Sequence, residues 1–395
     1  MSLLEPFPGR IVRSEWAEQV VSPMHDSLTP EEREAIMAER PYSWLHVSRT
    51  PEDGDEAELA ELEQTAFRRL LEVDAFERFP EPAVYVYRMV APDHEQTGIV
   101  GEVPHEAFIE GRVLGHEGVQ TERLEAVERH LERVGAASTL VALMFKSDDD
   151  IRKIVDAAME ERPLRRFTAG DLGQTVWRID DRDTIERIRE RLDGEVLYIT
   201  DGHHRARASV GLWERAGRPA GGGGPAVLFP EDQLRMLGFH RRITGPLAMD
   251  PEQLLERIRS RADVRPSDAP VGHRGAFGLY LDGRWYRVEL PPDGSGGGVG
   301  SLDVTRLHRE LLEPIFGLDG VGEGGVEFVS AAVALDELTG RVDDDRGAAF
   351  TLSPPTFEQF VDVADRHEEM PPKATFFDPK PQAGLFLRIR VDEPS

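Results

Sequence analysis

The segment EVLYITDGHHRARASVG, residues 195–211, most constrains the fold because its apolar run stops abruptly at Asp201 and Gly202. The run has the length and the β-branched content of a buried strand. Two histidines, an arginine and several small residues follow, and such small residues allow a helix to pack closely. The segment therefore predicts a strand, a tight turn and a helix in immediate succession, with polar side chains at their junction.

Three interpretations of this junction compete. In the first, Asp201, His203 and His204 bind a transition metal, although adjacent histidines at a helix start point about 100° apart and rarely reach one ion. In the second, which is physically stronger, the backbone N–H groups of the helix start bind a phosphate that Gly202 allows to approach closely. Arg205 and the histidines would then donate to the phosphate oxygens. In the third, Asp201 only caps the helix.

Helices and strands alternate along the rest of the chain, which predicts a mixed α/β (α+β) fold. Residues 29–32, Thr-Pro-Glu-Glu, fit a capping box with proline at the first helical position. Two glycine-rich stretches, 216–226 and 291–301, predict a flexible connector and a loose loop. Helices are expected at 55–72, 121–134, 151–160, 183–192, 303–315, 331–338 and 356–368, and strands at 83–90, 97–103, 139–145, 174–180 and 277–290.

The composition limits the class of protein and its partners. The chain has no cysteine, which excludes disulfides, thiolate catalysis and Cys-ligated metals. No apolar run approaches the roughly 18–20 residues of a membrane helix, and no secretory signal is evident at the start. The 47 basic and 74 acidic residues give a net charge of −27, which repels nucleic acid and anionic membranes. We therefore expect an acidic cytoplasmic protein that binds neither.

The segment YITDGHHRARAS resembles the DGHHR motif of the family catalogued as domain of unknown function 1015. The resemblance continues in order through EPFPGRIVRSEW, PYSWLHVSR, QTGIVGEV, GRVLGHEGVQ, LDVTRLHRELLEPIFGL and MPPKATFFDPKPQAGLF. These segments span nearly the whole chain, so we identify it as a member of that family. Two departures mark a divergent branch: Ala206 replaces a usual aromatic residue, and Leu114, Gly115 and Val119 stand where basic residues and threonine are common.

The DGHHR turn is also similar to the nucleotide-binding turn of the ParB and sulfiredoxin fold, and in particular to that of the free L-serine kinases. This resemblance covers residues 110–215 and implies a ParB/sulfiredoxin-like core that uses Mg²⁺ with ATP or ADP. The residues that it implies for phosphate binding are His116, Asp201, Gly202, His203, His204 and Arg205, with Asp201 also the implied Mg²⁺ ligand.

A kinase for a hydroxyl substrate needs a carboxylate that accepts or orients the hydroxyl proton. Glu117, in the glycine-flanked GHEG, has the place in the chain order that the serine-kinase resemblance implies, although a solvated loop carboxylate is the alternative. Lysine is rare in this chain, with four in all, and a compact ammonium suits a carboxylate or phosphate. The expected catalytic residues are Glu117, Asp201 and His204, and the expected substrate-binding residues are His46, Arg49 and Lys373.

We expect three regions: an N-terminal α/β region at 1–110, the nucleotide-binding core at 111–245 and a C-terminal α/β region at 246–395. The resemblance implies phosphoryl transfer from ATP or ADP to a small hydroxyl compound, first of all free L-serine, giving O-phosphoserine, by a chain that can form a homodimer. Two other classes stay open: a non-catalytic nucleotide-binding regulatory protein, and a metal-dependent hydrolase that would contain a transition metal.

Overall fold

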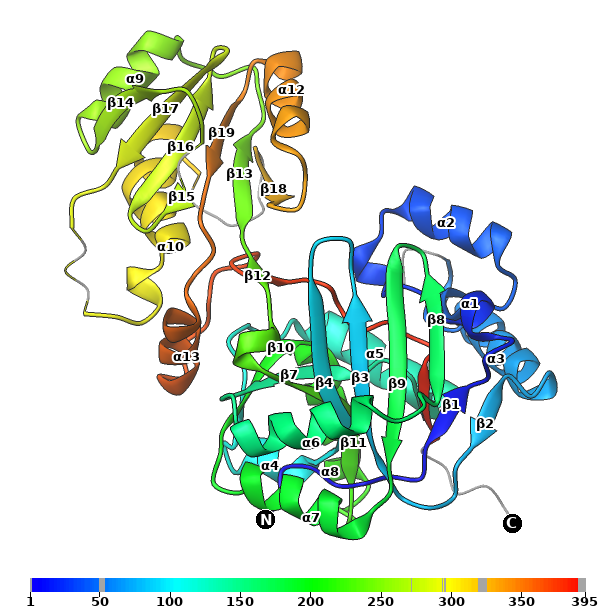
Figure 1. Ribbon diagram of the computed structural model, residues 1–395. Coiled ribbons are helices and arrows are strands. Elements are labelled where there is room, and N and C mark those ends of the chain that lie inside the picture. The colour runs from blue at the N-terminus through cyan, green and yellow to red at the C-terminus, as the bar shows by residue number, and fades with distance from the viewer. Residues whose placement is uncertain are drawn as a thin grey trace. The chain divides into compact units, whose positions relative to one another are not determined.

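The computed structural model in Figure 1 describes residues 2–49, 54–270, 272–292, 294, 296–318 and 325–389. Its helices and strands form two compact units. The first unit comprises the described residues up to Gly115, those from Val119 to Leu234, and those from Pro379 onward. The second comprises His116–Gly118 and Arg235–Asp378. The predicted mixed α/β class is confirmed, because sheets and helices occur together in both units.

The first unit is built on a mixed sheet with the strand order β5-β10-β7-β11-β4-β3-β9-β8. The strands are Val84–Val90 (β3), Glu95–Pro104 (β4), Val113–Leu114 (β5), Val141–Phe145 (β7), Arg165–Ala169 (β8), Leu172–Ile179 (β9), Leu197–Asp201 (β10) and Gly223–Pro230 (β11). β5 and β10 are parallel, as are β7 and β11, and the other neighbours are antiparallel. Strands from both sides of position 110 therefore share one sheet.

Four helices of the described chain accompany this sheet: His105–Ile109 (α4), Asp149–Met159 (α6), Arg182–Leu192 (α7) and His203–Arg215 (α8). α6 packs on β3 and β9, and α8 packs on β7 and β11 (Figure 1). The core holds Ile151 and Ile154 of α6 and Ile185 and Ile188 of α7, each buried. Because a fully buried isoleucine contributes about 1.5–3 kcal/mol, the apolar spacing of these helices fixes which face they turn to the sheet.

A second, antiparallel sheet ties the end of the chain to its beginning. Its order is β2-β1-β21-β6, with strands Arg10–Val12 (β1), Phe76–Arg78 (β2), Ala136–Ala137 (β6) and Phe386–Ile389 (β21). Because β21 pairs with both β1 and β6, the segment before it, which carries Lys380, also belongs to the first unit.

The remaining helices of the first unit are Ala17–Val20 (α1), Pro30–Glu39 (α2), Glu56–Glu72 (α3) and Thr121–Val134 (α5). The predicted capping box is confirmed: Glu32 N donates to Thr29 Oγ1 at 3.2 Å, and Thr29 N donates to Glu32 Oε2 at 2.8 Å. α3 and α5 are joined by Glu63, which is 1% exposed and accepts hydrogen bonds from His130 and Arg133. A buried carboxylate is retained there because two partners satisfy it.

The second unit has an antiparallel sheet with the order β14-β17-β16-β19-β13-β18, and β15 pairs with β16. Its strands are Phe239–Ile243 (β13), Asp263–Ser267 (β14), Gly272–His273 (β15), Ala276–Leu281 (β16), Arg284–Glu289 (β17), Val326–Ser330 (β18) and Ala348–Thr351 (β19), and a separate pair joins Met236–Leu237 (β12) to Phe376–Phe377 (β20). Its helices are Pro251–Arg259 (α9), Asp303–Leu307 (α10), Glu313–Phe316 (α11), Leu335–Asp345 (α12) and Phe357–Asp365 (α13).

One sequence prediction about an element was wrong. The glycine-rich stretch 216–226 is not wholly a connector, because Gly223 already begins β11. A Cβ on the adjacent Gly222 would lie 2.5 Å from the Trp213 ring, and one on Gly223 would lie 3.1 Å from the carbonyl oxygen of Val103, so glycine allows this close packing. The helix expected at 303–315 is confirmed, since residues 303–316 are helical throughout, and a π-helical segment, His308–Leu312, lies between α10 and α11.

A further difference concerns α12, which begins four residues later than expected, after a turn in which Val333 N donates to Ser330 O. The strand β8 was not predicted, and it pairs with β9 along Arg165–Ala169. In the part of the chain that the structure describes, no helix combines the length and the apolar character needed to cross a membrane.

Candidate functional site

The predicted succession of strand, turn and helix at residues 195–211 is confirmed. β10 ends at Asp201, α8 begins at His203, and Gly202 between them has a φ of +98°. That left-handed conformation favours glycine, which has no Cβ to clash. A Cβ on Gly202 would also lie 2.7 Å from Nη2 of Arg205. The backbone conformation therefore favours glycine here, and a Cβ would in addition displace the Arg205 guanidinium.

Gly202→Ala tests this requirement against Gly194→Ala, which serves as a matched control. Gly194 has a similar φ of +85°, but nothing lies within 4 Å of the place of its Cβ. We expect Gly194→Ala to cost ~1–2 kcal/mol of unfolding free energy through the backbone alone, and Gly202→Ala to cost more because Arg205 must also move. Urea denaturation measures both, and equal losses would contradict the account.

The carboxylate of Asp201 lies between two cations. Its side chain is 12% exposed, Oδ2 accepts a hydrogen bond from Nη2 of Arg205, and Oδ1 accepts one from Nζ of Lys380 at 2.8 Å. Lys380 Nζ also lies 3.9 Å from Oδ2 of Asp26. In a chain with a net charge of −27, two cations thus gather on one buried carboxylate at the start of α8.

The titration of Asp201 follows from these neighbours. Burial by itself raises the pKa of Asp201, but the charges of Arg205 and Lys380 outweigh it and hold that pKa well below its ordinary value. Burial likewise lowers the pKa of Lys380, but Asp201 and Asp26 outweigh this effect and raise it. At neutral pH the Asp201 carboxylate is therefore ionised, and Lys380 beside it stays charged.

The depressed pKa of Asp201 predicts an acid-sensitive contribution to stability. The pairing stabilises the fold above the pKa of the unfolded chain, about 3.9, and is lost as the pH falls from there through the folded pKa. We expect the difference in unfolding free energy between the wild type and Asp201→Asn to be largest near pH 7 and to shrink below about pH 4. Chemical denaturation at several pH values measures it, and a constant difference down to pH 3 would contradict the pairing.

The two histidines of the turn are held by the first unit itself. His203 is 6% exposed, and a Cβ on Gly115 would lie 3.0 Å from its ring. His204 accepts a hydrogen bond at Nε2 from Gln120 N, 3.1 Å away, at the start of α5. In this arrangement the ring proton of neutral His204 is on Nδ1. His204 therefore links the turn to α5, and its catalytic role stays a prediction.

The expected substrate-binding residues His46 and Arg49 also lie in the first unit. His46 Nε2 lies 3.1 Å from Met37 O and 3.2 Å from Arg40 O, so the ring donates to the end of α2. Burial lowers the pKa of His46, although these two carbonyl contacts oppose that effect. Nε of Arg49 is buried and has no hydrogen-bond partner among the described residues. His46 thus has a structural contact, whereas Arg49 keeps a donor that a ligand could use.

His116 and Glu117, in contrast, belong by their packing to the second unit. His116 is 4% exposed, its Nε2 lies 3.2 Å from Thr375 Oγ1, and its ring meets Phe360 edge-on with the centroids 4.6 Å apart. Glu117 beside it is exposed. The turn and the segment His116–Gly118 are therefore parts of different units, and the predicted roles of His116 and Glu117 remain predictions.

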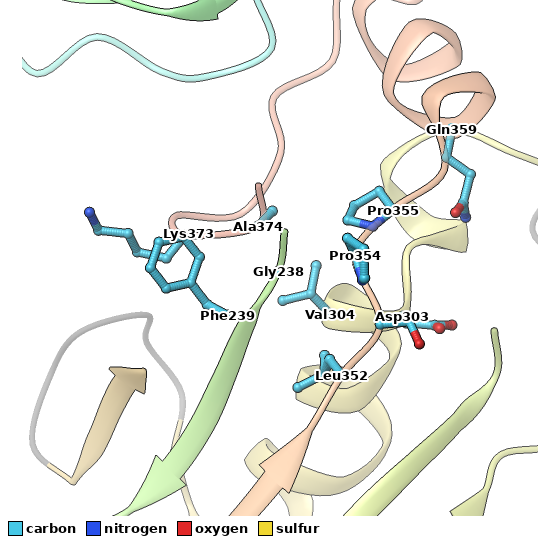
Figure 2. Close-up of a pocket in the computed structure, with 11 residues that line it drawn as sticks. Gly238, Phe239, Asp303, Val304, Leu352, Pro354, Pro355, Gln359, Lys373 and Ala374 are labelled. Atoms are coloured by element: carbon cyan, nitrogen blue, oxygen red, sulfur yellow. The ribbon is translucent and has the colours of Figure 1, made fainter. Parts of the chain in front are cut away.

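Lys373 also belongs to the second unit, beside a small pocket (Figure 2). In Figure 2 its ammonium end points away from the side of the pocket formed by Pro354, Pro355 and Asp303. Nζ lies 5.4 Å from the centroid of the Phe239 ring, a cation–π contact. The pocket holds only about 10 Å³, room for about one water molecule. A pocket of this volume is therefore too small for a substrate that Lys373 would bind.

The arrangement of the side chains offers little evidence for a metal site. Across the described ranges, no group of three or more histidine, aspartate or glutamate side chains is placed to hold an ion. At Asp201, where Mg²⁺ was expected, both carboxylate oxygens already contact cations. That donor set does not fit a divalent cation.

Lys380 and Asp26 are the residues that sequence reasoning did not place in the site. Lysine is rare in this chain, but its rarity does not tell which of Lys373 and Lys380 reaches Asp201. Asp26 lies in the short helical turn His25–Ser27, just before α2. The scarcity of lysine was the signal in the sequence that could have pointed to Lys380. Its pairing with Asp201 joins residues that lie far apart in the chain.

Comparisons with known proteins identify a matching family model, one partly similar relative and distantly similar structures. A family model described as "Protein of unknown function (DUF1015)" matches residues 4–305. A curated relative from Streptomyces griseus, described as "N-acetyltransferase", is 36% identical over 94 residues, which are 23% of this chain. The match spans 45% of that relative, less than half of its length.

Two solved structures resemble the fold distantly. Free serine kinase in complex with AMP has a TM-score of 0.37 and 15% identity, with 73% of this chain and 91% of that chain covered. SbnI from Staphylococcus aureus, with a C-terminal truncation, has a TM-score of 0.39 and 12% identity, with 72% and 85% covered.

Proposed function

The chain belongs to the family described as protein of unknown function (DUF1015), and we propose that it is a small-molecule kinase. It transfers a phosphoryl group from ATP or ADP to a hydroxyl compound, first of all free L-serine, which gives O-phosphoserine. The observation that carries the proposal is the pairing of Arg205 and Lys380 on the buried Asp201, at the start of α8.

The start of α8 suits a phosphate for several reasons. The first N–H groups of a helix lack partners within the helix, and the helix dipole adds partial positive charge there. The N-cap residue is Gly202, which supplies no side-chain cap and lets a ligand approach the backbone closely. Arg205 and Lys380 add two positive charges there, beside the carboxylate of Asp201 and, 3.9 Å from Lys380, that of Asp26. Such a concentration of donors and charge favours a polyanion such as a nucleotide phosphate.

Asp201 acts in this proposal as a positioning residue. Its carboxylate holds the Arg205 and Lys380 side chains at the turn while the site is empty, so little side-chain entropy is lost when phosphate oxygens take over part of their hydrogen bonds. Because Asp201 stays ionised, it also keeps the net charge of this cluster moderate, which lets the product leave.

The reaction itself needs positioning and charge more than covalent chemistry. The serine hydroxyl oxygen attacks the terminal phosphorus of the nucleotide, and the bond from that phosphorus to the bridging oxygen breaks, which releases ADP from ATP or AMP from ADP. The hydroxyl proton passes to a carboxylate, for which we propose Glu117. The cations at the turn stabilise the negative charge that gathers on the bridging oxygen.

Serine-dependent conversion of a nucleotide tests the function and identifies the donor together. The protein is incubated with ATP or with ADP, with and without L-serine, and the nucleotides are separated by chromatography. We expect conversion of one of the two only when serine is present. Tight nucleotide binding without any serine-dependent conversion would instead favour the regulatory alternative, and absence of binding would contradict the proposed site.

A further inference from the structure

A second cavity lies wholly within the second unit, between β13 and β18 on one side and the helical segment 303–316 on the other. Its volume is about 120 Å³. The apolar part of its wall includes Val304, Leu312 and Phe328, and the polar part includes Arg241, Thr305 and His308. A dry protein cavity of about 150 Å³ holds benzene, so this one has room for a ligand of about six heavy atoms.

Arg241 is an unusual residue to line such a cavity. It is 3% exposed, and no carboxylate of the described residues pairs with it. Its Nη1 donates to Phe239 O at 3.1 Å, and its Nη2 donates to Pro372 O and Lys373 O at 3.3 and 3.0 Å. The guanidinium also lies 4.5 Å from the centroid of the Phe328 ring. Three of its five N–H donors are thus engaged by carbonyls, which leaves up to two for a ligand.

The charge of Arg241 is only partly compensated by these contacts. Burial lowers the pKa of Arg241 to about 10, so the side chain still carries its charge at neutral pH. Burying a cation without an anionic partner costs free energy. An anion that entered the cavity would recover part of that cost, because it would supply the missing counter-charge.

Two further observations on the same wall point to a ligand. Oγ1 of Thr305 is buried and has no hydrogen-bond partner in the described part of the chain. The π-helical segment His308–Leu312 interrupts the helix at this place, and such segments are frequent at functional sites. The wider π turn carries His308 and Leu312, both of which line the cavity.

We propose that this cavity binds a small organic monocarboxylate with a short branched apolar group. The carboxylate accepts hydrogen bonds from Arg241 and Thr305, and the apolar group packs against Leu312 and Phe328. A remaining guanidinium donor and the Thr305 hydroxyl suit one carboxylate, and a cavity of this volume with apolar walls suits a group of three or four carbons. The proposal is independent of the kinase function, since every residue that lines the cavity belongs to the second unit.

Isobutyrate and its neutral isostere isobutyramide test the proposal by calorimetric titration of the full chain. We expect isobutyrate to bind in the millimolar range and the amide to bind about 10-fold more weakly, because a charge-assisted hydrogen bond is lost. Thr305→Val is expected to weaken isobutyrate binding about 5-fold, and Leu312→Phe to abolish it by filling the cavity. Thr339→Val, on α12 and outside the cavity, is the matched control and is expected to leave binding unchanged.

Several results would overturn the proposal. Equal affinities for acid and amide would show that Arg241 makes no contact with the ligand. Absence of binding up to tens of millimolar isobutyrate would show that the cavity takes no such acid. Inorganic phosphate that binds more tightly than isobutyrate and responds to Thr305→Val would replace the carboxylate by a phosphate. If Leu312→Phe fails to fold, the comparison of acid with amide and of Thr305→Val with Thr339→Val still decides.

Discussion

Glu117→Gln is expected to lower the turnover number with L-serine by about 10²–10⁴-fold while the affinity for the nucleotide stays unchanged. Glutamine has the size of glutamate but cannot accept the hydroxyl proton. Glu117 is exposed, so its replacement is not expected to disturb packing. Steady-state kinetics with saturating nucleotide measure turnover, and calorimetric titration measures the nucleotide dissociation constant.

Glu122→Gln provides the matched control for this change. Glu122 is an exposed carboxylate in the first turn of α5, five residues further along the chain. Its replacement removes the same charge nearby and is expected to leave turnover within about 2-fold, since one exposed charge contributes little. Normal turnover in Glu117→Gln would show that another group accepts the proton, without affecting the assignment of the nucleotide site.

Arg205→Ala is expected to raise the nucleotide dissociation constant by about 10–150-fold. Hydrogen bonds to charged groups contribute about 1.5–3 kcal/mol, and Arg205 is placed at the start of α8 to make them. The change also leaves Asp201 with Lys380 as its partner, so circular dichroism and thermal unfolding must accompany the titration. A folded Arg205→Ala protein that binds ATP and ADP like the wild type would contradict the proposed phosphate site.

The control for Arg205→Ala is Arg207→Ala, two residues along the same helix. Arg207 is exposed, and its replacement changes the net charge of the chain by the same amount. We expect its nucleotide affinity to stay within about 2-fold of the wild type, because a solvated charge at this distance is screened by salt. A similar loss in both variants would mean that Arg205 acts only through the overall charge.

Local patterns predicted the local part of the site well. The run before Asp201 predicted β10, the small residues after it predicted α8, and the glycine between them predicted the turn. Each of these depends on neighbours in sequence, as does the capping box at Thr29. The glycines of 216–226 were misjudged because glycine signals both loops and close packing, and only the position of Trp213 decides between them.

The long-range part of the site could not be read from the pattern. The contact between Lys380 and Asp201 depends on the return of the chain end beside β1, which pairs β21 with residues near the N-terminus. Nothing local distinguishes Lys380 from Lys373, yet the first pairs with Asp201 and the second lies over Phe239. The charge of Arg241 was visible in the sequence. Its burial beside a cavity depends on the packing of β13 with β18 and the segment 303–316, which lie far apart in the chain.

Phosphorus NMR of the reaction mixture tests the central claim most directly. Wild-type protein is incubated with L-serine and ATP or ADP, and Arg205→Ala and Arg207→Ala are treated in parallel. The account predicts a new phosphomonoester signal that coincides with added O-phosphoserine, in the wild type and Arg207→Ala but not in Arg205→Ala. A spectrum without that signal, from wild-type protein that demonstrably binds the nucleotide, would contradict the claim that this chain is a serine kinase.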